Sequence, residues 1–392
     1  MNSKIKIGIV GAKFAAQFHL EGYRRVYGIP IEVVGVTSRS RHNAEMFSKR
    51  NDIKVFDTLS DLLGAVDVVD ICSPAYSHES VAINSFRAGK DVIVEKPLTG
   101  FFGAGLSDFN ARIFPKEKML AGAISSARRI LEAADQSNRQ LMYAENWVYA
   151  PSIQKECEVL QATNGQILWI LGEESHSGSH SPAYGLWSQA GGGSIVGKGC
   201  HPLTAALYLK RQEGLARKAQ PLRPASVSAR VHDLTRLGSY IDRGFLRTDY
   251  LDVEDFGQMH VVFEDGMIAD IFSSEIVLGG VHNWLEIMAN NHRTRCNINP
   301  TNSLVTFNPQ EEQLKDVYVV EKIGTKQGWT NPAPDEDWMS GYPQELQDFM
   351  ECINHNREPK CGGELAQDTV AVMYASYVSA ERRGEEVPVT RS

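Results

Sequence analysis

The chain lacks the features that would tie it to a membrane, to nucleic acid or to a structural metal. Its six cysteines, at positions 72, 157, 200, 296, 352 and 361, are scattered and form no C-x-x-C pair, which argues against a disulfide framework and a zinc site. A formal net charge of -8 leaves no basic surplus for following phosphates along a nucleic acid. No stretch reaches the ~20 apolar residues that span a bilayer, and the first residues do not form a signal peptide. We therefore expect a cytoplasmic protein with no metal, nucleic-acid or membrane partner.

Length and composition indicate two globular domains. The 392 residues are 42% hydrophobic and 22% charged, an ordinary balance for a folded protein that is too long for one small core. We predict a dinucleotide-binding domain at residues 1–148. A substrate-binding and oligomerisation domain is predicted at residues 149–392.

In the first domain, short apolar runs alternate with helical stretches. Strands are predicted at residues 5–10, 31–37, 53–56, 66–72, 91–95 and 140–144. Helical segments are predicted at residues 15–27, 41–49, 59–63, 77–88 and 125–134. This alternation predicts an α/β fold with a doubly wound parallel sheet of the Rossmann type. Residues 99–118, rich in Gly and Phe and poorly periodic, are predicted to be an inserted loop that could cover a site.

The second domain has a different pattern. Alternating stretches predict strands at residues 167–174, 225–234, 256–264, 267–277 and 284–289. Helices are predicted at residues 202–213, where Gly214 is expected to stop the helix, and at residues 343–354 and 365–383. We expect an α+β domain with a large, mostly antiparallel open sheet.

The first predicted strand ends in a turn that departs from the dinucleotide pattern at one position. G-x-G-x-x-G/A is expected between a strand and a helix, and here Gly11 supplies the tight turn while Ala16 is small enough for helix–strand packing. Lys13 replaces the second glycine. Its ammonium could lie near a phosphate together with the helix N-terminus at Phe14 and Ala15. An ordinary strand–turn–helix remains the alternative.

The second predicted strand ends near Ser38 and Arg39, where an acidic residue would bind the ribose hydroxyl of NAD. An arginine there can accommodate the 2′-phosphate of NADP, so the pair permits NADP and does not exclude NAD. A solvated loop arginine is the alternative interpretation.

Several motifs together resemble the Gfo/Idh/MocA oxidoreductases, a family named for glucose–fructose oxidoreductase, inositol dehydrogenase and a rhizopine catabolism protein. The motifs are ICSP at residues 71–74 with His78, AGKDVIVEKPL at residues 88–98, GGGSIVGKGCH at residues 191–201, VEDF at residues 253–256 and FEDG at residues 263–266. The resemblance covers nearly the whole chain and makes the weak turn at Gly11 credible as a cofactor site.

The resemblance implies an NAD cofactor, with NADP as the second choice. It implies that the cofactor also contacts Ser73, Pro74, His78, Glu95 and Lys96. Lys96 is expected beside the nicotinamide and the substrate hydroxyl, where it would polarise that hydroxyl. Burial near another cation would lower its pKa. A surface ion pair is the alternative for this lysine.

The same resemblance implies that His201 is the general acid–base that takes the hydroxyl proton. Many family members carry an aspartate four residues earlier, where this chain has Gly197. We expect His180, Glu173 or Glu174 to supply the missing support. Alternatively, Lys198 points into the site and holds an anionic substituent of the substrate.

Three further side chains are candidates for substrate contact. His176 and His180, in a polar segment hinged by glycine, could bind sugar hydroxyls, and His180 could also act in catalysis. No third ligand accompanies them for a metal, and plain loop residues are the alternative. Tyr149 could stack on a sugar face at the domain junction, or could belong to the core.

These features predict an oxidoreductase that uses NAD(P) to oxidise a ring hydroxyl of a sugar, cyclitol or glycoside. A second possibility is an NAD-dependent glycosidase that works by oxidation, elimination, hydration and reduction, on substrates that could be anionic or sulfonated. A third is a non-catalytic dinucleotide sensor, against which the retained Lys96 and His201 argue. The resemblance implies a homodimer or homotetramer formed through the C-terminal sheet.

Overall fold

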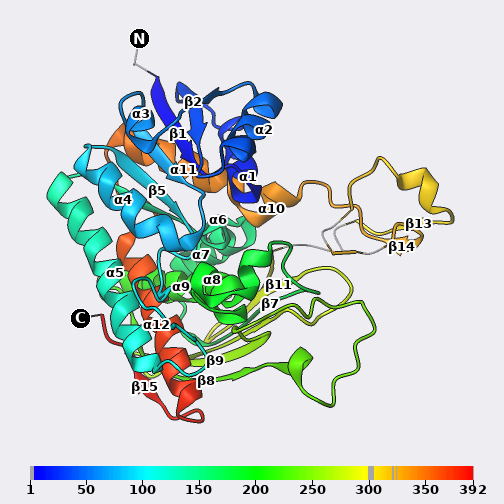
Figure 1. Cartoon of the computed structure of the whole chain (residues 1–392). Coiled ribbons are helices and arrows are strands. Elements are labelled where there is room, and N and C mark those ends of the chain that lie inside the picture. The colour runs from blue at the N-terminus through cyan, green and yellow to red at the C-terminus, as the bar shows by residue number, and fades with distance from the viewer. Residues whose placement is uncertain (1–3, 299–303, 320–321, 324, 392) are drawn as a thin grey trace.

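Two β-sheets with helices packed against them organise the chain (Figure 1). The computed structural model describes residues 4–298, 304–319, 322–323 and 325–391. Within these residues no helix is long and apolar enough to cross a membrane.

The first sheet is parallel throughout, as predicted. Its strand order is β3-β2-β1-β4-β5-β6. The strands are β1 (Ile5–Val10), β2 (Ile31–Thr37), β3 (Lys54–Val55), β4 (Val68–Ile71), β5 (Asp91–Glu95) and β6 (Leu141–Ala144). The order changes direction between β1 and β4, and in such sheets ligands bind at the carboxyl ends of the strands beside that point.

Helices pack beside this sheet. They are α1 (Phe14–Tyr23), α2 (Arg41–Asn51), α3 (Leu59–Leu63), the short η1 (Ala75–Ser77), α4 (His78–Arg87) and α5 (Lys116–Ser137). Two boundaries differ from the prediction. Helix α1 ends at Tyr23, four residues early, and α5 begins at Lys116 inside the predicted loop. The remaining loop is held by packed rings of Phe101, Phe109 and Phe114.

The second sheet has seven strands in the order β12-β11-β7-β10-β9-β8-β15. All of its pairs are antiparallel except β7 with β10. The strands are β7 (Ile167–Ser175), β8 (Pro224–His232), β9 (Phe256–Phe263), β10 (Ile268–Ser274), β11 (His282–Ala289), β12 (Arg293–Asn297) and β15 (Val387–Pro388). The predicted mostly antiparallel second sheet is therefore confirmed.

Further helices connect and cover these strands. They are α6 (Asn146–Tyr149), α7 (Pro151–Thr163), η2 (Pro182–Gly185), α8 (Trp187–Ala190), η3 (Ile195–Gly199), α9 (Cys200–Lys218), η4 (Leu234–Arg236) and α12 (Gly363–Glu381). The predicted stop at Gly214 is wrong, because α9 continues to Lys218. The chain turns back at Ala219, and a Cβ on Gly214 would lie 2.4 Å from the carbonyl oxygen of Gln220. Gly214 therefore permits close packing rather than ending the helix.

The segment after β12 forms an arm that projects from the molecule (Figure 1). It contains β13 (Thr306–Asn308), η5 (Glu311–Leu314) and β14 (Gly328–Thr330). The chain then returns through α10 (Glu336–Ser340) and α11 (Tyr342–His355). Helix α11 packs against α1, and Arg25 pairs with Asp335 at 2.9 Å. The domain division at residue 148 remains a prediction. Helix α11, from late in the sequence, packs against α1 of the first domain.

Glu254 organises the glycine-rich turn that precedes α9. Its buried carboxylate accepts hydrogen bonds from the backbone N–H groups of Gly193 at 3.1 Å and Ile195 at 2.9 Å, and from the Tyr377 hydroxyl at 2.8 Å. Burial raises the pKa of Glu254 to about 7, even though these hydrogen bonds pull it down. The carboxyl group thus titrates nearer neutrality than an exposed glutamate.

This shift predicts that Glu254 makes the folded protein less stable as the pH rises. The folded pKa lies above the ordinary value of 4.5, so the folded state binds more protons between about pH 4.5 and about pH 7. The glutamate's contribution is fully present below that window and is lost through it, by about 2 kcal/mol between pH 5 and pH 7.5. Urea unfolding at the two pH values should show this fall in the wild type and a smaller one in Glu254→Gln. Equal falls in both proteins would contradict the assignment.

Candidate active site

The turn after β1 is shaped by contact with the end of β4. Gly11 has a φ of +112°, and a Cβ there would lie 2.6 Å from the carbonyl oxygen of Cys72. Both facts demand glycine. Ala16 is fully buried in the small core beside this turn, as its place in the motif predicted.

Helix α1 begins directly after this turn with free donors. Lys13 is its N-cap residue and its side chain does not cap the helix. The first N–H groups of a helix that lacks a side-chain cap attract anions such as a pyrophosphate. Phe14 is well exposed beside them. This is the geometry expected for the phosphate part of a dinucleotide site.

The segment near the end of β2 carries an arginine stacked on an aromatic ring. The Arg39 guanidinium lies 5.7 Å from the centre of the Tyr76 ring, and Phe102 meets the same ring edge-on at 6.5 Å. Phe102 comes from residues 99–118, so that segment reaches the region predicted to bind the adenosine ribose. Ser38, directly after β2, is partly buried.

His78 connects two loops of this region through their backbones. Its ring nitrogens lie 2.9 Å from the Pro97 carbonyl oxygen and 2.8 Å from the Ser73 carbonyl oxygen. Burial lowers the pKa of His78. Both ring nitrogens of His78 therefore contact the protein's own backbone. The ring holds the loop at Ser73 and the loop after Lys96 next to each other, so its effect on a cofactor site would be indirect. Pro74 begins η1, where the Ser73 and Ser77 hydroxyl oxygens lie 2.7 Å apart.

Lys96 follows β5 and reaches into the second half of the chain. Its ammonium donates to the carbonyl oxygen of Gly197 at 2.8 Å and lies 5.9 Å from the centre of the Tyr184 ring. Gly197 belongs to the π-helical turn η3. Pro202 has no N–H to offer the carbonyl five residues before it, which leaves that oxygen open to the lysine. The Lys96 ammonium thus donates to the backbone of the residue that stands where many family members carry an aspartate.

The expectation of a lowered pKa for Lys96 is wrong. Burial alone lowers the pKa of Lys96, but Tyr184, Cys200 and Glu174 outweigh it and hold the pKa above the ordinary value. Acidic groups surround the ammonium where a cation was expected. Lys96 is therefore a persistent positive charge in the site.

His201 lies in the first turn of α9 between two carboxylates. Its Nδ1 is 2.5 Å from Oε1 of Glu145, and its Nε2 is 3.8 Å from Oε2 of Glu174. The ring stacks on Trp147 at 6.0 Å with an interplanar angle of 20°. Glu145 directly follows β6 and Glu174 belongs to β7. The acid missing at Gly197 is thus supplied from two other elements.

One of these two acids was among the candidates and the other was missed. Glu174 stands beside His201, whereas Glu173 accepts a hydrogen bond from Trp284 Nε1 at 3.1 Å. Glu145 follows a predicted strand directly, and the carboxyl ends of parallel strands are where ligands bind. That position was the signal that could have identified it.

Glu174 has the properties of a proton-exchanging group. Burial raises the pKa of Glu174, although His201, Lys96 and Lys198 pull it down. Its Oε2 is buried and has no hydrogen-bond partner among the residues that the structure describes. A carboxyl group in this state can accept or donate a proton beside the histidine.

Lys198 and Tyr149 are placed inside the protein. The Lys198 ammonium pairs with Glu275 at 2.7 Å and donates to Ser179 at 2.9 Å, with 2% of its side chain exposed. The Tyr149 hydroxyl donates to Asp348 at 3.0 Å and is almost fully buried. Both polar groups are therefore already satisfied by protein partners, which favours the core interpretation of Tyr149.

The two loop histidines have separate surroundings. His176 Nδ1 accepts a hydrogen bond from the Gly178 N–H at 3.1 Å. Burial and the charge of Lys198 lower the pKa of His176, so its ring is neutral. His180 lies 3.2 Å from the Lys322 ammonium, and its ring centre is 6.4 Å from that of Phe14. The structure thus places His180 beside the exposed start of α1.

Comparison with known proteins identifies relatives of part of the chain. Residues 5–103 match the family model described as the GFO_IDH_MocA oxidoreductase family with an NAD-binding Rossmann fold. Glucose-6-phosphate 3-dehydrogenase of Bacillus subtilis is 32% identical over 24% of this chain and 26% of its own length. Inositol 2-dehydrogenase of Cereibacter sphaeroides is 31% identical over 26% of this chain and 30% of its own length. An uncharacterised protein of Saccharomyces cerevisiae, YMR315W, is 29% identical over 38% of each chain, so the matches cover well under half of these relatives.

Solved structures share the fold over the full length. GenD2 from gentamicin A biosynthesis, crystallised with NAD, superposes with a TM-score of 0.79 and 21% identity over 100% of this chain and 97% of its own. Scyllo-inositol dehydrogenase from Lactobacillus casei, with bound NAD(H) and scyllo-inositol, superposes with a TM-score of 0.72 and 17% identity over 99% of each chain. The predicted resemblance to the Gfo/Idh/MocA oxidoreductases is confirmed, and residues 5–103 match the NAD-binding Rossmann fold of that family.

Proposed function

We propose that this protein is an NAD(P)-dependent oxidoreductase that acts on a ring hydroxyl of a sugar, cyclitol or glycoside. The observation that carries the proposal is the pairing of a permanent cation with a supported histidine. Lys96 and His201 come from different halves of the chain, and both lower the pKa of the buried carboxyl group of Glu174. This combination suits an alcohol that must lose a proton as hydride leaves its carbon.

The residues present fit a dinucleotide cofactor. Gly11 allows the close turn, the uncapped start of α1 offers N–H donors, and Lys13 adds a positive charge beside them. Arg39 and Ser38 would lie at the adenosine ribose, where the absence of an acid permits NADP as well as NAD. When bound, the nicotinamide of such a cofactor accepts a hydride from the substrate carbon or returns it.

The chain's own residues handle the proton. With the Nδ1–H of His201 donated to Glu145, Nε2 carries the lone pair that can take the hydroxyl proton. The charge of Glu145 then stabilises the resulting imidazolium, and the ammonium of Lys96 polarises the hydroxyl oxygen. Trp147 fixes the plane of the imidazole ring.

The surroundings favour a neutral polyhydroxy substrate. Lys198, the cation expected to hold an anionic substituent, is neutralised by Glu275. His176 is uncharged, and its free ring nitrogen suits a sugar hydroxyl. We retain His176 and His180 as proposed substrate contacts. A homodimer or homotetramer through the second sheet also stays a proposal, which size-exclusion chromatography with light scattering would decide.

Glu174 favours a second candidate, an NAD-dependent glycosidase. A cycle of oxidation, elimination of the aglycone, addition of water and reduction needs more acid–base groups than one histidine. The buried Glu174, with its raised pKa and its oxygen without a hydrogen-bond partner, is such a group. The cycle returns the hydride and leaves no net reduced cofactor.

One assay separates these functions. Purified protein would be incubated with NAD or NADP and a panel of sugars, cyclitols and aryl glycosides, while the nicotinamide absorbance and aglycone release are followed together. A rise in reduced cofactor with a sugar or cyclitol supports the dehydrogenase. Aglycone release without that rise supports the glycosidase. Nucleotide binding by calorimetry with neither reaction would contradict both enzymes and leave a dinucleotide sensor.

Replacing Lys96 should remove most of the activity. We expect Lys96→Ala to lower kcat by about 10²-fold or more, because a positioned polarising group is lost. Lys90→Ala is the matched control, since Lys90 also donates to a backbone carbonyl, that of Val66, in the same domain. Initial rates of both variants, with folding checked by circular dichroism, measure the effect. A near-normal kcat for Lys96→Ala would mean that the motif no longer acts in catalysis.

Neutralising Glu145 should slow the reaction without weakening substrate binding. A glutamine can still accept from His201 Nδ1 but cannot stabilise the imidazolium, so kcat should fall by about 10- to 100-fold with little change in KM. Glu173→Gln is the matched control, because Glu173 contacts Trp284 instead. Steady-state kinetics of both variants, giving kcat and KM separately, test this prediction. Equal effects of the two substitutions would rule out a specific role for Glu145.

A further inference from the structure

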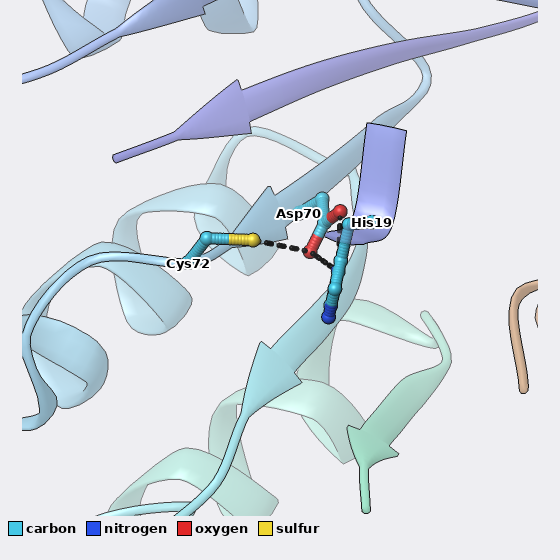
Figure 2. A group of neighbouring side chains, drawn as sticks. All are labelled: His19, Asp70 and Cys72. Carbon is cyan, nitrogen blue, oxygen red and sulfur yellow. Dashed lines mark hydrogen bonds and ion pairs between the residues drawn. The ribbon is translucent and has the colours of Figure 1, made fainter. Parts of the chain in front are cut away.

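A buried row of ionisable groups ends at Glu95, the residue that directly precedes Lys96. His19 of α1 stands between Asp70 of β4 and Glu95 of β5. Its Nδ1 lies 2.9 Å and 3.0 Å from the two Asp70 oxygens, and its Nε2 lies 3.4 Å from Oε1 of Glu95. Figure 2 shows the imidazole ring beside Asp70, with its second nitrogen pointing away from that carboxylate. The row therefore runs from the core of the first sheet towards the active site.

The position of His19 calls for a positively charged ring. Both of its neighbours are carboxylates, which accept hydrogen bonds and donate none when ionised, whereas a neutral imidazole has only one N–H. The Glu95 contact lacks hydrogen-bond alignment and acts between charges. Burial alone lowers the pKa of His19, but the charge of Asp70 outweighs it and holds the pKa well above the ordinary value. His19 is thus a buried cation.

The other groups around His19 do not supply a competing charge. Burial keeps the pKa values of Cys72, Tyr23 and Tyr342 above their ordinary values, so these three side chains are neutral near pH 7, and burial also raises the pKa of Glu345. The Tyr23 hydroxyl donates to Asp70 at 2.9 Å.

The charge on His19 matters because Glu95 precedes Lys96. Burial raises the pKa of Glu95, but contact with His19 reverses the shift, with further help from Lys96 and His201, and the net pKa is lowered. Glu95 therefore stays ionised inside the protein. Its negative charge in turn helps to keep Lys96 protonated.

We propose that His19 and Asp70 form a permanent buried ion pair that holds Glu95 as a carboxylate and so keeps Lys96 charged in the active site. They are positioning residues that touch neither substrate nor cofactor. The effect on catalysis rests on the proposed function, whereas the charge on His19 does not. The two claims can therefore be tested separately.

The first test is a nuclear magnetic resonance titration of protein labelled with ¹⁵N-histidine. His19→Gln identifies the His19 signals by their loss. In the wild type they should remain those of an imidazolium from about pH 5 to about pH 9, beyond the ordinary histidine range. Asp70→Asn should let His19 lose its proton within that range, and Tyr23→Phe, which removes only a neutral hydrogen bond to Asp70, should not. A wild-type His19 that titrates near pH 6.5 would overturn the proposal whatever the protein's activity.

The second test is the pH profile of kcat/KM. With Glu95 no longer held as an anion, Lys96 should lose its proton more readily. Asp70→Asn and His19→Gln should therefore lose kcat/KM at high pH where the wild type, with Lys96 still charged, does not. Tyr23→Phe should keep the wild-type profile. A wild-type profile in folded His19→Gln would refute the catalytic part, whereas absence of activity in the wild type would refute the proposed function and leave the resonance result standing.

Discussion

The hydrogen bond from the Lys96 ammonium to the Gly197 carbonyl joins the two halves of the site. Lys96 stands at the carboxyl end of the first sheet, and Gly197 lies in the π-helical turn that delivers His201. Pro202 has no N–H to compete for this backbone oxygen, which leaves it available to the ammonium. If this contact were lost, the ammonium and the imidazole would no longer share one set of acidic neighbours.

Charge balance around this contact decides what the site can do. A buried ammonium costs several kcal/mol unless anions compensate it, and here Glu95 and Glu174 do so. Lys198 has a different surrounding, because its ammonium is already paired with the Glu275 carboxylate. Two neighbouring lysines thus have different roles through their partners alone.

Short-range patterns allowed much of the fold to be predicted. Apolar β-branched runs separated by helical stretches gave the parallel sheet, and the motif around Lys96 gave the family. Helix ends were less predictable. Glycine is needed at position 214 because the chain packs closely on it at Gln220 and Leu222, and the sequence pattern around Gly214 does not show this contact. The start of α5 at Lys116 was hidden by the phenylalanines before it, whose rings pack on one another.

The acid–base support was the least predictable part of the site. Glu145 and His201 are 56 positions apart in the chain, and the packing of α6, which begins directly after Glu145, against α9 brings them together. The pairing of Lys198 with Glu275 spans 77 positions and likewise follows from the tertiary fold. Sequence reasoning could name lysine, histidine and candidate acids. It could not determine which acid pairs with which base.

The central claim is that Lys96 and His201 act on one hydroxyl of a polyol. The most direct measurement is a crystal structure with oxidised cofactor and a sugar or cyclitol that the assay identifies. The account predicts one substrate hydroxyl within hydrogen-bond distance of both Lys96 Nζ and His201 Nε2, with its carbon facing the nicotinamide. A substrate bound with its hydroxyls away from either group, or with Lys96 still committed to Gly197 alone, would contradict it.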